Sequence, residues 1–267
     1  MFMDASHRPA RLLVASFLGS VGGCLLAATV HIDPGTPAGA SSDGSREHPF
    51  KTWGKVQIAD GNTRVFFIAN GERQTRGILE HNDMRGPLTD GDGGAIVYSG
   101  TGSGLVVRHN TFSGPVPGGI YHHSRDLQVY GNVFVDLPMG VANHTDSRCR
   151  VFNNTFHNVD LCVVGRAVAA VNNIFSLPRE GQRAFTWKGG LVEKRNLVTR
   201  GPAGPDRLIG DPLFNDVAAG DFRLTPGSPA IDAGIVVGSE IDREGTRIPT
   251  GKAPDIGAFE WHGVDVR

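Results

Sequence analysis

Short apolar stretches recur along the middle of the chain, and an asparagine follows most of them. In most copies an aromatic residue stands two positions after the asparagine, as in Asn-Thr-Phe and Asn-Ile-Phe. Recurrence at a period of about 20 to 50 residues is typical of repeat architectures. The pattern therefore predicts stacked coils of short strands, with one asparagine in the same turn of each coil. These residues are Asn82, Asn110, Asn132, Asn154, Asn173 and Asn196, separated by 28, 22, 22, 19 and 23 residues.

The repeat also predicts which side chains stack. Asparagine amides in equivalent turns can hydrogen-bond from coil to coil, and the phenylalanines that follow can stack in the interior. In three coils a further short strand begins eight residues after the asparagine. Alternation with period 2 along that strand predicts that Ile120, Ala142 and Val164 point inward.

The flanking sections differ from the coils in composition. We expect residues 29–75 to form an N-terminal cap with the first strands, residues 76–200 the coils, and residues 201–267 a C-terminal cap region. A solenoid needs atypical ends because its terminal coils would otherwise expose their core. Carboxylates in the last section stand in turn phrases, where they typically accept backbone N–H groups. They are Asp211, Asp221, Asp232, Asp255 and Glu260.

Residues 1–28 are typical of a signal peptide. Basic residues between His7 and Arg11 precede the uncharged stretch from Leu12 to Ala28, which predicts export and a secreted, cell-surface or periplasmic protein. An uncleaved membrane anchor, or a lipoprotein lipidated at Cys24, remains an alternative. In an exported protein Cys149 and Cys162 could form a disulfide.

Three segments carry a resemblance to a known group of proteins. The opening from Val30 to Trp53, the Asn-x-Phe coils and the turn phrases from Asp211 to Glu260 resemble bacterial exported right-handed parallel β-helix proteins. These include proteins with a choice-of-anchor C-terminal region, within the pectate lyase-like superfamily. The resemblance covers most of residues 30–260. It implies an all-β fold, a single-stranded right-handed parallel β-helix with an N-terminal cap and an irregular C-terminal cap.

The same resemblance sets expectations for function. The group includes polysaccharide lyases and glycoside hydrolases, so it implies a carbohydrate-active protein. This chain departs from the group in its short segment between Trp53 and Asn82, which implies a shorter groove for a polymer. With 26 basic and 27 acidic residues the net charge is −1, which gives no electrostatic case for nucleic acid or an anionic membrane surface.

Counting from the asparagines brings out a candidate catalytic set. His122, His144 and Arg166 each lie 12 residues after an asparagine, so they are expected on successive coils about 5 Å apart. In a lyase acting by β-elimination they would serve as base, acid and carboxylate neutraliser, in an order that the sequence leaves open. Lys188 lies a further 22 residues on and is a candidate for substrate binding. The alternative is a solvated polar stripe.

Sixteen residues after two of the asparagines stand Asp126 and Arg148. Opposite charges at equivalent positions of neighbouring coils predict a surface ion pair, worth less than about 1 kcal/mol.

The longest coil, from Asn82 to Asn110, predicts a protruding loop near residues 89–94. Asp90 and Asp92 in this loop could bind Ca²⁺, the one cofactor that the sequence suggests, or act as a hydrolase acid and base. Asp92 could also contact substrate. The alternative is an ordinary Asp-Gly turn. Tyr98 and Tyr121 could stack on sugar rings, or be half-buried strand residues.

Together these observations favour an exported polysaccharide lyase acting on an acidic polysaccharide. A glycoside hydrolase and a non-catalytic polysaccharide-binding solenoid are the alternatives, because fold alone does not decide function.

Overall fold

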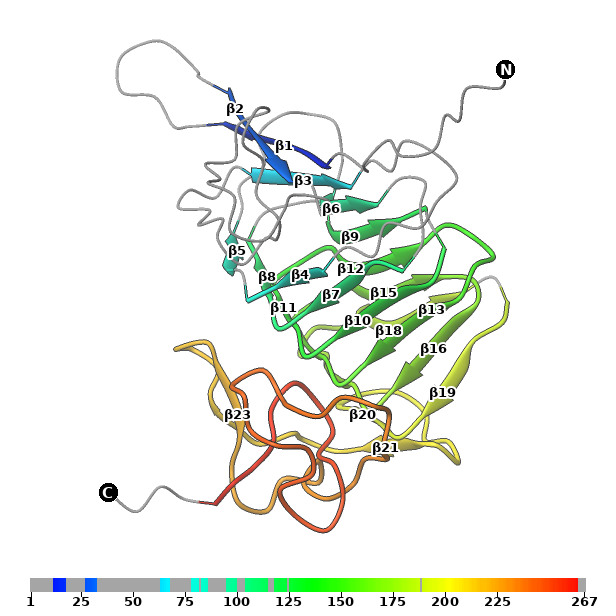
Figure 1. Cartoon of the computed structure of the whole chain (residues 1–267). Coiled ribbons are helices and arrows are strands. Elements are labelled where there is room, and N and C mark those ends of the chain that lie inside the picture. The colour runs from blue at the N-terminus through cyan, green and yellow to red at the C-terminus, as the bar shows by residue number, and fades with distance from the viewer. Residues whose placement is uncertain are drawn as a thin grey trace, which may run out of the picture.

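The protein is an all-β solenoid of about four turns, seen in a computed structural model (Figure 1). The structure describes residues 78–81, 83–85, 104–114, 118–123, 125–187 and 189–263. It also gives the backbone of four further strands: β1 (Leu12–Phe17), β2 (Ala27–Ile32), β3 (Thr63–Phe67) and β6 (Ala95–Ser99). No helix occurs within these residues. The predicted signal peptide and N-terminal cap, residues 1–75, otherwise lie outside the described residues.

Each coil contributes one strand to each of three sheets. Sheet A runs in the order β18-β15-β12-β9-β6-β3-β1-β2, sheet B in the order β19-β16-β13-β10-β7-β4, and sheet C in the order β21-β20-β17-β14-β11-β8-β5. All pairs between coils are parallel, whereas β1 is antiparallel to both β2 and β3. The chain therefore passes from sheet A to B to C and then to the next coil.

The strands are short, three to five residues in every coil. The remaining strands of sheet A are β9 (Gly118–His122), β12 (Met139–Asn143), β15 (Leu161–Gly165) and β18 (Arg183–Trp187). Those of sheet B are β4 (Ile78–Glu80), β7 (Val106–Arg108), β10 (Leu127–Tyr130), β13 (Cys149–Phe152), β16 (Val168–Val171) and β19 (Val192–Lys194). Those of sheet C are β5 (Asp83–Arg85), β8 (Thr111–Ser113), β11 (Val133–Val135), β14 (Thr155–His157), β17 (Ile174–Ser176), β20 (Asn196–Val198) and β21 (Arg207–Ile209).

The predicted asparagine ladder is confirmed in the turn between sheets B and C. In each of four consecutive pairs the Nδ2 of one asparagine donates to the Oδ1 of the next at 3.0 Å. The same Oδ1 also accepts the backbone N–H of the ladder asparagine one coil earlier. Each Nδ2 donates in addition to backbone carbonyls of sheet B, as Asn132 does to those of Val107 and Tyr130. Buried amides are thereby satisfied. The ladder comprises Asn110, Asn132, Asn154, Asn173 and Asn196, all fully buried; Asn82 lies outside the described residues.

The predicted aromatic stack is confirmed beside this ladder. Phe112, Phe134, Phe156 and Phe175 are fully buried, with successive ring centroids 4.8, 4.6 and 5.1 Å apart. Offset rings at such distances are favourable beyond the area they bury. Glycine makes room for them on sheet A, since a Cβ at Gly140 would lie 2.7 Å from Cε1 of Phe156.

The prediction of inward residues on sheet A is confirmed for Ile120, but Ala142 and Val164 stand at outward positions, although Ala142 is itself fully buried. Ile120 pairs with Val141, which pairs with Val163, and these three residues enter the core. Ala142 pairs instead with Tyr121, and Val164 with Ala142. The cause is a difference in the corners: residues 114–117 join β8 to β9, but only residues 136–138 join β11 to β12. The strand register on sheet A therefore shifts by one residue.

The two cysteines of the coils are not paired. Cys149 on β13 and Cys162 on β15 are both free and buried, so the disulfide that the sequence left open is not formed. Burial raises the pKa of the Cys149 thiol to about 12, which leaves it protonated and unreactive at neutral pH.

The C-terminal region packs along the outer face of sheet C. Its strands are β21, which extends sheet C, and the antiparallel pair β22 (Phe214–Asp216) and β23 (Asp221–Leu224). Figure 1 shows the region in orange and red below the last coils. Its apolar residues pack against the outward residues of sheet C, as Ala258 does on Val133 and Ile256 on Ile174 and Leu197. The outward residues Val133, Ile174 and Leu197 of sheet C are therefore buried, like the inward residues of the same strands.

The turn carboxylates of this region accept backbone N–H groups, as predicted. Asp255, for example, accepts from Asp232 at 2.7 Å and from Trp261 at 2.6 Å. The same holds for Asp211, Asp221, Asp232 and Glu260.

Candidate functional site

Three rings from two coils lie face to face where sheet A turns toward sheet B. Tyr121 and His123 stand two residues apart at the end of β9, so both point outward. His144, just after β12, stacks on Tyr121 at 5.2 Å between centroids and on His123 at 4.9 Å, with interplanar angles of 10° and 11°. Both imidazoles are exposed and Tyr121 is half-buried. We call Tyr121, His123 and His144 the ring platform.

His122 is not part of this surface. It is fully buried, and its strand position pairs with Asn143 and not with His144. Burial, with a smaller effect of His123, lowers the pKa of its imidazole to about 4, and Asp126 partly opposes this shift. The predicted alignment of His122 with His144 and Arg166 is therefore wrong. Counting from the asparagine overlooked the extra residue in the preceding corner, which puts His123 in the place assigned to His122.

The rest of that alignment is confirmed. Asn143 pairs with Gly165, so His144 and Arg166 are the first residues after their strands on neighbouring coils. The backbone N–H of Arg166 donates to the Asn143 carbonyl at 3.4 Å. Its guanidinium is exposed and lies 3.3 Å from Asp146, an ion pair worth under about 1 kcal/mol that a stronger anionic ligand can displace.

The predicted pair of Asp126 and Arg148 is also confirmed, with Nη2 and Nε both 3.1 Å from Oδ1. The corner around the ring platform thus carries three arginines, Arg125, Arg148 and Arg166, against Asp126 and Asp146. Without counting the histidines, the arginines exceed the aspartates by one positive charge. The local field is weakly basic, although the whole chain is nearly neutral.

Other predicted site residues are placed only in part. The backbone of Tyr98 pairs with Tyr121, which gives it the equivalent position on the preceding coil. Its side chain lies outside the described residues, as do Lys188, Asp90 and Asp92. Within the part of the chain that the structure describes, no three His, Cys, Asp or Glu side chains are grouped so that they could hold a metal ion. The predicted Ca²⁺ site therefore stays a prediction.

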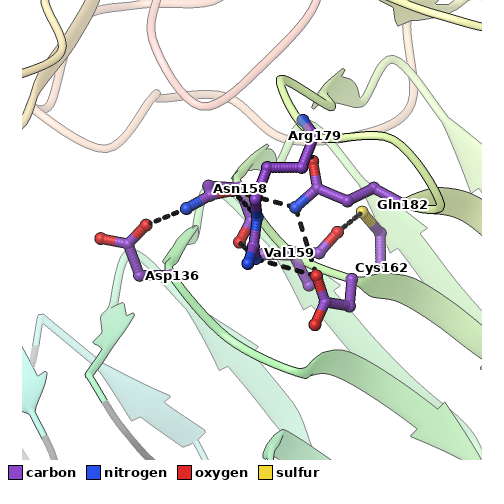
Figure 2. Close-up of polar contacts among 7 residues, drawn as sticks. Asp136, Asn158, Val159, Cys162, Arg179 and Gln182 are labelled. Atoms are coloured by element: carbon purple, nitrogen blue, oxygen red, sulfur yellow. Dashed lines mark hydrogen bonds and ion pairs between the residues drawn. The ribbon is translucent and has the colours of Figure 1, made fainter.

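A second polar cluster lies at the corner between sheets C and A (Figure 2). Asn158 donates to Asp136 at 2.5 Å, and its Oδ1 accepts from Arg179 at 2.7 Å and from Gln182 at 3.0 Å. Arg179 and Gln182 also contact Asp160. These side chains bond chiefly to one another, so the cluster braces the corner and is a weaker candidate for ligand binding than the ring platform.

His123 is the site residue that the sequence analysis missed. Its signal was present in the His122-His123 pair at the end of an apolar strand. Of two adjacent residues only one can point outward from a strand, and the strand pairing decides which one does.

Neither a protein-family model nor a curated protein sequence matches the chain. Among the described residues, no helix is long and apolar enough to cross a membrane.

Proposed function

We propose that the protein binds an acidic polysaccharide across the outer face of sheet A, on the ring platform and Arg166. The observation that carries this proposal is the stack of Tyr121, His123 and His144 at an exposed corner. A ring face that no neighbouring ring covers can offer apolar contact to the carbon face of a sugar, while the polar edges of the rings can hydrogen-bond. Export, predicted from residues 1–28, would bring the protein to such a polymer.

Arg166 gives this surface its preference for acidic sugars. A guanidinium pairs with a carboxylate through two parallel hydrogen bonds, which adds geometric specificity to the charge. Arg166 lies one coil beyond His144, and neighbouring strands are spaced by about 4.8 Å. Tyr98, one coil before Tyr121, would extend the surface in the other direction.

Cleavage of the bound polymer by β-elimination is a second candidate, supported by the nearness of His144, Tyr121 and Arg166. His144 would remove the proton α to a uronate carboxylate while Arg166 neutralises that carboxylate. The electron pair would form a carbon–carbon double bond, and the glycosidic oxygen would leave with a proton from Tyr121. Lys188 and Asp92 keep their predicted roles in substrate binding. Hydrolysis would need two facing carboxylates, and the predicted pair, Asp90 and Asp92, lies outside the described residues.

Binding and turnover can be measured in one set of experiments. The protein would be titrated with polygalacturonate, alginate and chondroitin sulfate, and with neutral dextran as a control. We expect binding to one or more acidic polymers that weakens with added salt. Ultraviolet absorbance of an unsaturated product would establish elimination, and new reducing ends without absorbance would establish hydrolysis.

Matched variants locate the site. His144→Ala and Arg166→Gln should each weaken binding at least about fivefold, the effect of one hydrogen bond or ring contact. The controls are His262→Ala and Arg200→Gln, the same changes at exposed positions of the C-terminal half. Binding to dextran as strong as to the acidic polymers, or equal losses in the control variants, would refute the proposal.

A further inference from the structure

One buried amide holds the two chain segments that carry His144 and Arg166. Asn143, the last residue of β12, is 1% exposed. Its Nδ2 donates to the carbonyl of Ser147 at 3.0 Å and to the carbonyl of Arg166 at 2.6 Å. Both N–H groups of the amide are thereby used. The first bond closes the loop that begins with His144, and the second ties that loop to Arg166 on the next coil.

The carbonyl side of the same amide braces the loop from within. Oδ1 of Asn143 accepts from the backbone N–H of Thr145 at 3.3 Å and from its Oγ1 at 3.1 Å. Thr145 Oγ1 in turn accepts the backbone N–H of Ser147 at 3.2 Å. Such side-chain bonds to the backbone two residues on fix a turn in one conformation. The backbone of His144 is therefore held at both ends.

The partner of Asn143 on the next coil is a glycine for a steric reason. Gly165 has a φ of 125°, and a Cβ there would lie 2.0 Å from the carbonyl oxygen of Asn143. Only glycine allows the two backbones this approach. The approach in turn brings the N–H of Arg166 to the Asn143 carbonyl. Asn143 and Gly165 thus set the separation of His144 and Arg166.

We infer that Asn143 is a positioning residue for polysaccharide binding, acting through His144 and Arg166 without touching the ligand. This inference rests on the proposed function. The geometric reason is that His144 contacts both other rings of the platform with interplanar angles near 10°, so a small shift of its backbone would break two contacts together. The corner with Asn158 shows the contrast, because its similar network holds no member of the ring platform.

A change at Thr145 tests the inference with little risk to the fold, because Thr145 is only half-buried. Thr145→Val removes the hydroxyl that bonds Asn143 and Ser147 but keeps the shape, and Thr145→Ser restores the hydroxyl. We expect Thr145→Val to weaken binding of polygalacturonate or alginate at least about fivefold, and Thr145→Ser to bind like the wild type. Thr199→Val is the matched control, since the Thr199 hydroxyl accepts from Leu177 N–H at another corner; it should bind like the wild type.

Asn143→Asp is the stronger variant. The carboxylate keeps an acceptor for Thr145 but has no N–H to donate to the carbonyls of Ser147 and Arg166. The loop that begins with His144 and its link to Arg166 should therefore both loosen. Its control is Asn158→Asp, which likewise loses a side-chain amide donor, here in an exposed bond to Asp136. Thermal unfolding of both variants shows whether weaker binding comes from loss of the fold or from displacement of His144 and Arg166 in a folded protein.

A readout without ligand keeps this inference separate from the proposed function. Imidazole proton shifts of His123 and His144 report the ring stack through ring currents, and they should move toward unstacked values in Thr145→Val but not in Thr199→Val. Wild-type protein that binds no acidic polymer would defeat the proposed function, while the shifts would still test the geometry. Unchanged shifts and unchanged binding in Thr145→Val and in folded Asn143→Asp would overturn the inference.

Discussion

Asn154 and Asn173 are only 19 residues apart, yet the Nδ2 of Asn154 donates to the Oδ1 of Asn173 at 3.0 Å, the same distance as in the 22-residue coils. The 19-residue coil is shorter because one of its corners between strands is shorter. Residues 166–167 join β15 to β16, whereas residues 144–148 join β12 to β13. Coil length therefore varies outside the strands, and the ladder keeps its geometry.

Removing one rung should destabilise the whole solenoid. Asn154→Ala deletes donors to two carbonyls and to Asn173, and it deletes the acceptor for Asn132. Buried groups left without partners cost roughly 1–3 kcal/mol each, so we expect a loss of at least about 3 kcal/mol in urea unfolding.

The control for this ladder variant is Asn215→Ala, whose amide makes one exposed bond to Asp221. We expect a loss below about 1 kcal/mol there. Similar losses in the two variants would mean that the ladder amides are not a main source of stability.

The phenylalanine stack should be equally sensitive. Phe156 lies between Phe134 and Phe175 with no exposed surface. Phe156→Ala should cost about 3–5 kcal/mol, since it removes transfer free energy and leaves a cavity. Phe156→Leu fills most of that space and should cost clearly less. Urea unfolding of the two variants checks the order, and a reversed order would contradict close packing at this position.

Acid should weaken the fold through buried histidines. Burial lowers the pKa of His109 and of His122 to about 4, from 6.5. Below pH 6.5 the unfolded chain binds protons that the folded chain rejects, so the stabilisation is present above pH 6.5 and is lost as the pH falls toward 4. For one such group the change is about 3 kcal/mol.

The measurement isolates His122 by difference. The unfolding free energies of wild type and His122→Gln would be compared at pH 7.5 and pH 4.5, and the gap between them should narrow at the lower pH. His262→Ala, at an exposed position, should show a gap that does not change with pH. A constant gap for His122→Gln would contradict the buried, neutral imidazole.

The C-terminal region should detach locally when one asparagine is changed. Asn172 donates to the Ile235 carbonyl at 2.7 Å and accepts the Ile235 N–H at 3.0 Å. Its φ is 54°, so Asn172→Gly removes both bonds without adding backbone strain. We expect faster proteolysis near residues 234–238 while the asparagine ladder persists.

Asn153→Gly provides the comparison for this experiment. Asn153 has a φ of 50° and makes one bond to the region, to the Asp255 carbonyl at 3.2 Å. Its effect on proteolysis should be smaller. Cleavage that is as slow in Asn172→Gly as in the wild type would show that other contacts, such as the bond from Arg150 to the Val237 carbonyl, hold the segment.

Several features could be predicted from the sequence because they depend on residues at one fixed distance from the ladder. The ladder bonds, the stacked phenylalanines and the pair of Asp126 with Arg148 all join residues 19 to 23 positions apart, within one turn or one sheet. The turn carboxylates were equally predictable, since their partners lie nearby in the chain or in neighbouring turns.

The candidate site was only partly predictable. His144 and Arg166 were placed correctly, but His122 was assigned the position that His123 occupies. Between Asn110 and Asn132 one corner is longer by a residue, and the next, residues 123–126, is shorter than its equivalent 144–148. The two differences cancel over the coil, so the spacing of 22 conceals them.

The sequence by itself determined the parallel solenoid, its ladder and its core stack, because these follow from a repeat that brings like residues together at the strand spacing. Only the tertiary structure decided which of two adjacent histidines faces solvent, that Cys149 and Cys162 remain apart, and that the C-terminal region covers sheet C. Each of these depends on corner lengths or on contacts between distant segments. Strand pairing and packing between distant segments fix these features, and they cannot be read from the spacing of residues along the chain.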